Sequence, residues 1–206
     1  MEVPAGAREV HVAGGRLARW LAGFAERHGA VTTTSTSQVV SLEGADGAQA
    51  WIDVPFPPLD GDLVQHATRP RRIGVLLVRR GGYAVGVFDG DRLVASKVGS
   101  SYVQGTTKAG GWSQQRFARR RANQADAAFA EAADVAARLL GPESLDALVA
   151  GGDRAAVRTV LGDPRLAGLP AASPPWLQVK DPKLRVLAAT PEQFLTVKIT
   201  LTDPTV

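Results

Sequence analysis

The sequence contains no cysteine. This absence excludes disulfide bonds, thiol nucleophiles and thiolate metal sites together, and it is typical of a cytoplasmic protein. The chain also lacks an apolar run of about eighteen residues, so no membrane-spanning helix is expected. Its start, Met1-Glu2-Val3-Pro4, has no basic segment followed by an apolar stretch, and we expect no secretory signal there.

Few residues suit metal or cofactor chemistry. The three histidines, His11, His28 and His66, are scattered, and none stands at metal-ligand spacing from a carboxylate. Asp89 and Asp91 belong to a turn rather than to the carboxylate cluster that a two-metal nuclease requires. No phosphate-binding loop, dinucleotide fingerprint or nucleophile elbow is present. We therefore expect neither a metal nor a cofactor.

The composition is that of an ordinary globular protein with clustered positive charge. The 206 residues are 45% hydrophobic and 21% charged, which is enough to bury a core, and the formal net charge is +4. The two arginine clusters are Arg69, Arg71, Arg72, Arg79 and Arg80, followed by Arg116, Arg119, Arg120 and Arg121. Such clusters indicate a nucleic-acid or anionic-surface binder, although a solvated basic face is an equally good interpretation.

Residues 1–70 predict a helix and a β-hairpin. After an extended start at 9–12, apolar residues recur at helical spacing from Leu17 to Ala25, and Gly29 is a natural stop. The further elements are a loop or edge strand at 32–37 and hairpin strands at 38–42 and 50–54. The segment from Pro55 to Pro70 is rich in proline and aspartate. We place the domain boundary there, giving domains 1–70 and 71–206.

The remainder predicts an α/β fold of the α+β type, with a mixed sheet flanked by helices. A three-strand meander is followed by a long helix, then by strand, helix and strands. The expected strands are 73–78, 83–88, 92–98, 144–150, 184–189 and 194–200, and the expected helices are 117–139 and 154–161. Gly151-Gly152-Asp153 supplies a turn and an N-cap for the second helix. Backbone amides that hold a phosphate there are the less favoured alternative.

The stretch from Lys108 to Arg121 combines backbone freedom, side-chain amides and dense positive charge. Gly110 and Gly111 permit positive φ and a close approach to a ligand. A glutamine amide supplies a donor and an acceptor without any pKa shift, so it can hold a water but cannot act as an ordinary general base. Trp112 offers a stacking plane, and arginines can grip phosphates bidentately. Composition alone favours a mobile surface loop before a basic helix.

The segment Gly110-Gly-Trp-Ser-Gln-Gln-Arg-Phe-Ala-Arg119 resembles the catalytic-domain signature of eukaryotic and archaeal release factors, Gly-Gly-Gln-Ser-x-x-Arg-Phe-Ala-Arg. The likeness covers roughly residues 72–189. In ungapped register the catalytic glutamine of that signature falls on Trp112, and the nearest glutamine is Gln114. The resulting Gly-x-x-Gln, Gly111 to Gln114, is similar to the Vms-type release-factor-like hydrolases and their compact bacterial branch. The chain is identified as a member of that branch.

The resemblance implies a hydrolase that frees nascent chains from peptidyl-tRNA on stalled large ribosomal subunits, with residues 71–206 as its catalytic domain. Water would attack the ester, and catalysis would come mainly from positioning. Gln114 would orient the water, and Gly110 and Gly111 would let the loop fit the peptidyl-transferase centre. The residues implied in RNA contact are Lys108, Arg116, Arg119, Arg120, Arg121, Trp112 and Tyr102. Gln115 is the rival catalytic residue, and packing is an equally good role for Tyr102.

The partners that follow are the large ribosomal subunit, rRNA and the CCA end of peptidyl-tRNA. A cytoplasmic monomer without a membrane partner is expected. One alternative is a ribosome or RNA binder with the same fold and an inactive loop. Another is a nuclease that cuts the 3′ end of tRNA, although no metal-ligand cluster or histidine pair supports it. A small-molecule enzyme has no supporting motif.

Overall fold

The computed structural model describes residues 6–100 and 112–204, and it describes side chains for 6–100 and 126–204. The chain divides into two compact units, which are Met1–Pro70 with Pro191–Val206, and Arg71–Thr190. The first boundary falls at the proline-rich segment, and the second, at Pro191, has no counterpart in the division expected from the sequence. Each unit contains one five-stranded sheet.

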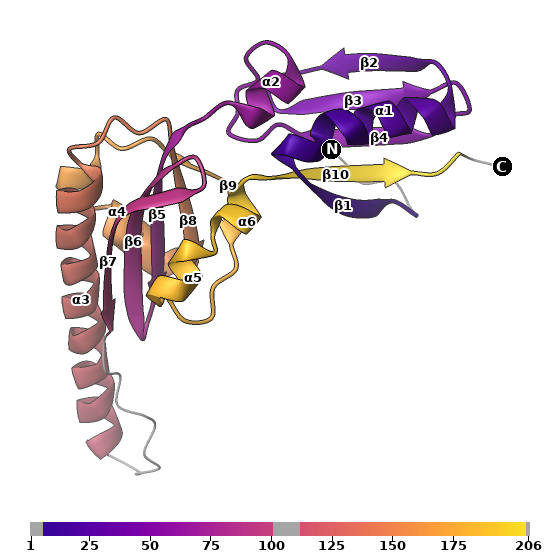
Figure 1. The fold of residues 1–206 in the computed structure, drawn as a ribbon. Coiled ribbons are helices and arrows are strands. Elements are labelled where there is room, and N and C mark those ends of the chain that lie inside the picture. The colour runs from indigo at the N-terminus through magenta and orange to yellow at the C-terminus, as the bar shows by residue number, and fades with distance from the viewer. Residues whose placement is uncertain (1–5, 101–111, 205–206) are drawn as a thin grey trace. The chain divides into compact units, whose positions relative to one another are not determined.

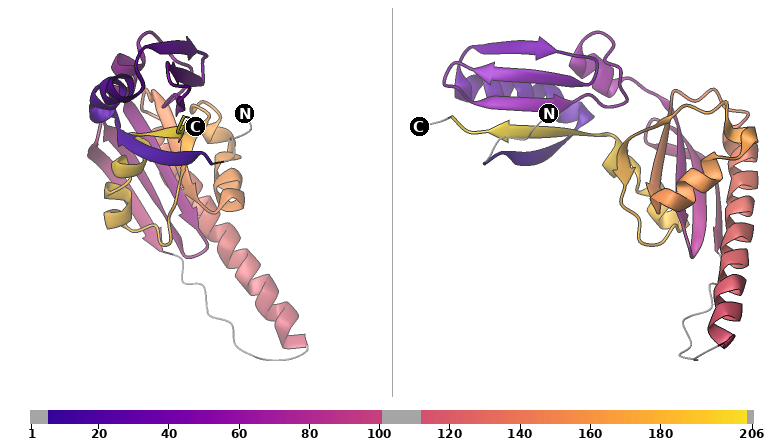
Figure 2. Two further views of the ribbon diagram at one scale, coloured as in Figure 1. Left: turned by 90° about the vertical axis from the view of Figure 1, so that its right-hand side faces the viewer. Right: turned by 180° about the vertical axis from the view of Figure 1, so that it is seen from behind.

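The first unit is an antiparallel sheet in the order β1-β10-β4-β3-β2, with one long helix packed on it (Figures 1 and 2). Its elements are β1 (Arg8–Ala13), the short 3-10 helix η1 (Gly14–Arg16), α1 (Leu17–His28), β2 (Val31–Ser35), β3 (Val39–Gly44), β4 (Gln49–Asp53), α2 (Leu63–Thr68), α6 (Pro191–Phe194) and β10 (Thr196–Thr202). The predicted helix and hairpin are confirmed. The tract at 32–37 forms an edge strand, β2.

The core of the first unit lies between α1 and one face of the sheet. Leu17 and Phe24 are buried from the helix, and Ile52 and Ile199, which pair across β4 and β10, are fully buried from the strands. The helix ends at Gly29, whose φ of 77° suits a glycine. The last strand of the chain therefore completes the core of the first unit.

The second unit is a mixed sheet in the order β7-β6-β5-β8-β9. Its elements are β5 (Arg72–Arg79), β6 (Gly82–Asp89), β7 (Arg92–Ser100), α3 (Trp112–Leu140), β8 (Ala147–Gly152), α4 (Arg154–Leu161), the 3-10 helix η2 (Pro164–Leu166), β9 (Ala172–Leu177) and α5 (Leu184–Ala188). The antiparallel β5-β6-β7 meander is confirmed. β8 runs parallel to both β5 and β9.

Helices cover both faces of this sheet (Figure 1). α3 and α4 pack on one face, where residues such as Leu76, Val85 and Leu148 meet Ala132 and Val157. On the other face, α5 buries Leu187 against β6. The close approach favours a glycine at position 86, because a Cβ there would lie 3.0 Å from methyl carbons of Leu187 and Leu93. Among the described residues, no helix is both long and apolar enough to cross a membrane.

The strand β9 and the short helix α2 were not expected from the sequence, and two predicted elements differ in kind or extent. The apolar run 184–189, expected as a strand, is the helix α5. The long helix, expected from Phe117, begins at Trp112, so that Gln114 lies in its first turn rather than in a loop. No glycine or proline follows Gly111 for many residues, and nothing in that stretch opposes a helix.

Candidate functional site

The residues expected to act in catalysis and RNA binding lie in the segment before α3 and in the first turns of that helix. Tyr102, Lys108, Gly110 and Gly111 lie outside the described residues. The others belong to the first three turns of α3, for which the structure describes the backbone. They are Trp112, Gln114, Gln115, Arg116, Arg119, Arg120 and Arg121. The segment thus connects the last residue of the edge strand β7, Ser100, to the start of α3.

The helix that carries these residues is longer than the sheet on which it packs. Its 29 residues correspond to about 43 Å at 1.5 Å per residue. The eight residues of β6 span about 27 Å. Among the described side chains of α3, the buried ones lie between Ala128 and Leu140. Figure 1 shows the N-terminal turns of α3 continuing past the ends of β6 and β7.

Tyr83 of β6 joins the sheet to α3 on the C-terminal side of the projecting turns. Its side chain is buried, and its hydroxyl donates to a carboxylate oxygen of Glu131 on α3 at 2.9 Å. A Cβ at Gly99 of β7 would lie 2.3 Å from the tyrosine ring, so the ring needs a glycine there. Burial, and then Glu131, raise the pKa of Tyr83 to about 12, which keeps the phenol protonated and donating. No local pattern in the sequence indicates this contact.

The first arginine cluster is largely occupied by contacts within the protein. Arg71 is buried. Arg69 pairs with Asp60, Arg72 pairs with Glu143, and Arg79 donates to the carbonyl oxygen of Val179 at 2.6 Å. These contacts favour a structural role for most of the cluster over a continuous RNA-binding face.

Asp153 settles the role of the Gly151-Gly152-Asp153 turn. Its carboxylate accepts hydrogen bonds from the backbone N–H groups of Ala155 and Ala156, at 2.9 and 3.1 Å. Those amides are the ones that would otherwise hold a phosphate at the start of α4. The turn with an N-cap is therefore confirmed. The N–H groups of Ala155 and Ala156 already donate to Asp153 and are not available to a phosphate.

Two of the three histidines, His28 and His66, have local partners. His66 is buried in the first unit, accepts from the Asp60 N–H through Nδ1 at 3.2 Å and donates to the Pro55 carbonyl through Nε2 at 2.8 Å. His28 Nδ1 lies 2.9 Å from Asp46. Over the described ranges, no cluster of three or more histidine or acidic side chains could hold a metal ion.

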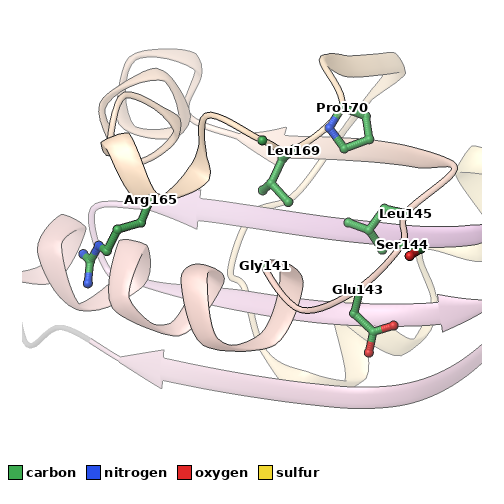
Figure 3. A pocket seen from close by; sticks show the side chains of 8 residues that line it. Gly141, Glu143, Ser144, Leu145, Arg165, Leu169 and Pro170 are labelled. Atoms are coloured by element: carbon green, nitrogen blue, oxygen red, sulfur yellow. The ribbon is translucent and has the colours of Figure 1, made fainter.

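A pocket of about 260 Å³ lies near the starts of β8 and β9, at the end of the sheet opposite to Ser100 (Figure 3). It is lined by residues that follow α3 and η2, among them Glu143, Leu145 and Leu169. Its two charged lining residues are paired, Glu143 with Arg72 and Arg165 with Asp134 and Asp163. This pocket is separate from the segment that carries the expected catalytic residues.

Comparison with known protein families matches residues 71–200 to the family described as Actinobacteria/chloroflexi VLRF1 release factor. The match spans more than half of the chain. The chain belongs to this release-factor family. Membership of the VLRF1 release-factor family confirms the resemblance seen in the sequence and indicates a role in translation that involves the ribosome. No curated protein matches the sequence.

The match to the VLRF1 family runs from the start of β5 into β10. It contains every residue that the sequence suggested for catalysis or RNA contact. It also contains Tyr83 and Glu131, which join β6 to α3, and Asp153, which caps α4.

Proposed function

We propose that this protein is a peptidyl-tRNA hydrolase that releases nascent chains from tRNA on stalled large ribosomal subunits. The observation that carries the proposal is the sequence Gly111-Trp112-Ser113-Gln114 at the start of the long helix of a VLRF1 release-factor domain. The expected partners are the large subunit, rRNA and the CCA end of peptidyl-tRNA. A cytoplasmic monomer without a cofactor fits this function.

The position of Gln114 in α3 suits a hydrolase that works by positioning. The first four backbone N–H groups of a helix have no partner within it, and Gln114 is the third residue of α3. The positive end of the helix dipole also favours negative charge there. The backbone N–H of Gln114 is thus suited to stabilise charge that develops on the ribose oxygen, while its side-chain amide holds the attacking water.

The reaction balances without a cofactor. The water oxygen bonds to the ester carbonyl carbon, and the bond from that carbon to the ribose oxygen breaks. The ribose oxygen leaves with a proton that comes from the water, and the peptide leaves with a free carboxyl group. Gly110 and Gly111 would allow close approach to the ester. RNA contacts would come from Tyr102, Lys108, Trp112, Arg116, Arg119, Arg120 and Arg121.

The first prediction tests Gln114 directly. In an assay on isolated large subunits that carry peptidyl-tRNA, Gln114→Ala should lower the rate of peptide release by about 100-fold or more, because it removes a group that acts on the reacting atoms. Gln115→Ala is the matched control. An α-helix turns about 100° per residue, so adjacent helical positions lie on different faces, and the control should retain release.

Three other outcomes are informative. Loss of release in Gln115→Ala alone would move the catalytic role to Gln115. Full release by both variants would refute the hydrolase and favour a non-hydrolytic ribosome binder. A tRNA product shortened at its 3′ end would identify a nuclease. Binding of each variant to large subunits should equal that of the unaltered protein, which separates a catalytic defect from misfolding.

A further inference from the structure

One end of the sheet in the second unit, which we call the edge, is formed by the ends of all five strands. The chain leaves this edge at Ser100 and enters the expected catalytic segment. Ser100, at the end of β7, pairs with Gly82, and Gly82 pairs with Arg79 at the end of β5. β8 and β9 run parallel to β5 and end at Gly152 and Leu177 on the same side. With strands about 4.8 Å apart, the ends of β5, β8 and β9 lie roughly 10 to 19 Å along the edge from the end of β7.

Three exposed cations follow these strand ends, and we call them the edge cations: Arg80, Arg154 and Lys180. Arg80 comes directly after β5, Arg154 begins the helix after β8, and Lys180 follows β9. Within the part of the chain that the structure describes, none of the three forms an ion pair with a carboxylate. Among the other exposed cations of this unit, Arg92 pairs with Asp89 and Lys183 with Asp181, whereas Lys97, Arg158 and Arg185 likewise have no carboxylate partner among the described residues.

Arg154 is held in place by an aromatic ring. The carbon at the centre of its guanidinium lies 4.4 Å from the ring centroid of Trp176 on β9. The Trp176 indole N–H donates to the carbonyl oxygen of Gly152 at 3.1 Å, which fixes the ring to the end of β8. A guanidinium that stacks on a ring keeps its in-plane N–H groups available for an anion.

Lys180 is positioned through its neighbour Val179. Arg79, at the end of β5, reaches across β8 and donates to the carbonyl oxygen of Val179 at 2.6 Å. The crossing passes Gly152, where a Cβ would lie 3.0 Å from the Arg79 side chain and 2.3 Å from the Val78 carbonyl oxygen. With a φ of 91°, position 152 also favours glycine. This edge therefore carries one guanidinium that is stacked on a ring and a lysine whose neighbouring backbone is held by Arg79.

Charge is divided unequally between the two units. The first unit has six lysines and arginines against ten aspartates and glutamates, a net charge of −4. The second has eighteen against ten, a net charge of +8. A polyanion is therefore attracted to the second unit and repelled by the first.

We propose that the edge cations form a second phosphate-binding surface, which holds an RNA backbone at the end of the sheet where β7 finishes and the chain enters the catalytic segment. The choice of RNA as the anion rests on the proposed function, because peptidyl-tRNA and rRNA are the polyanions that a ribosome-bound hydrolase meets. Bidentate arginine and a lysine point charge are both suited to phosphate. None of these three residues belongs to the signature that suggested the catalytic segment.

The test measures how binding of the full chain to deacylated tRNA depends on salt, for example by fluorescence anisotropy. Each lost phosphate contact should reduce the slope of log affinity against log salt by about 0.7 to 0.9. Arg80→Glu with Lys180→Glu should therefore reduce the slope by about 1.4 to 1.8, and adding Arg154→Glu should reduce it further. The matched control is Arg92→Glu, at the opposite edge of the sheet, and it should leave the slope unchanged.

The outcomes are separable from those of the proposed function, because the binding assay is run in a Gln114→Ala background. An unchanged slope in the double variant would overturn the proposal. Weaker binding to large subunits together with unchanged binding to tRNA and to protein-free rRNA would also overturn it, in favour of a protein partner. A reduced slope supports the RNA surface even if peptide release is never observed. The double variant alters only exposed side chains, and circular dichroism checks its fold.

Discussion

At the scale of single residues, Tyr83 has a position that the sequence does not reveal. It is a buried phenol on β6, the middle strand of the antiparallel meander, and its hydroxyl donates to the Glu131 carboxylate on α3. The contact lies on the described part of α3, about 17 residues or 25 Å along the helix from Gln114. Because α3 is continuous, a hydrogen bond at its packed end helps to fix where its first turn lies.

Tyr83→Phe removes this hydroxyl and keeps the ring. We expect the free energy of unfolding to fall by about 1 to 2 kcal/mol at neutral pH, because a hydrogen bond to a charged acceptor is lost. The folded-state pKa is raised from 10.0 to about 12, so the native state holds its proton more tightly. Stability from this group is full below pH 10 and is lost as the pH rises toward 12.

The measurement is denaturant unfolding at neutral pH and across the window from pH 10 to 12. The phenylalanine variant should lose less stability than the unaltered protein over that window, since it has no phenol to titrate at this position. Equal losses in the two proteins would show that the Tyr83 hydroxyl is not coupled to folding.

At the scale of elements, capping supplies a matched pair of experiments. Asp153 caps α4 in the second unit, and Asp62 caps α2 in the first by accepting from two backbone N–H groups at 2.9 and 3.0 Å. α4 contributes buried Val157 and Val160 to the core of its unit. The two caps make the same kind of contact in different units.

Asp153→Ala should lower the stability of the second unit by about 1 kcal/mol, because two amides at the start of α4 lose their acceptor. Hydrogen exchange followed by mass spectrometry can assign the effect to peptides of α4 and β8. Asp62→Ala should change exchange in the first unit and leave those peptides unaffected. An effect of Asp153→Ala that is confined to the first unit would contradict this assignment.

The elements that the sequence predicted well are those with local signals. α1 has an apolar stripe and a glycine stop, and the meander has tight turns between apolar strands. The errors arose where local signals are ambiguous. A short apolar run such as 184–189 fits a strand or a helix equally. β9 contains Pro174 and Pro175, which argue against a strand, and it is tolerated because it lies at the sheet edge.

The candidate site divides in the same way. Glycines, glutamines and arginines stand together between 108 and 121, so the sequence alone points to that segment. Contacts between distant residues have no such signal. Tyr83 and Glu131 are 48 residues apart, and the pairing of Arg154 with Trp176 depends on two parallel strands lying side by side. Those contacts follow from the tertiary fold.

At the scale of the whole molecule, the chain returns to its first unit after completing the second. β10 lies between β1 and β4, with Val10 opposite Ile199 on one side and Ile52 opposite Ile199 on the other. β1 is an edge strand whose neighbour in the sheet is β10. Val197 and Leu201 of β10 are also buried in the core beneath α1. The first unit therefore depends on both ends of the chain.

A chain that ends at Thr190 should accordingly lose the first unit and keep the second. It lacks β10, the interior strand between β1 and β4, which leaves β1 without its pairing partner and exposes the apolar face of α1. The second unit, Arg71–Thr190, retains its whole sheet and its own core.

Hydrogen exchange should show loss of protection across β1 to β4 and retained protection in β5, β6 and β8. Because the second unit holds the net positive charge, the shortened chain should still bind tRNA in a salt-dependent manner. Retained protection in β3 and β4 would show instead that the first unit folds without its last strand.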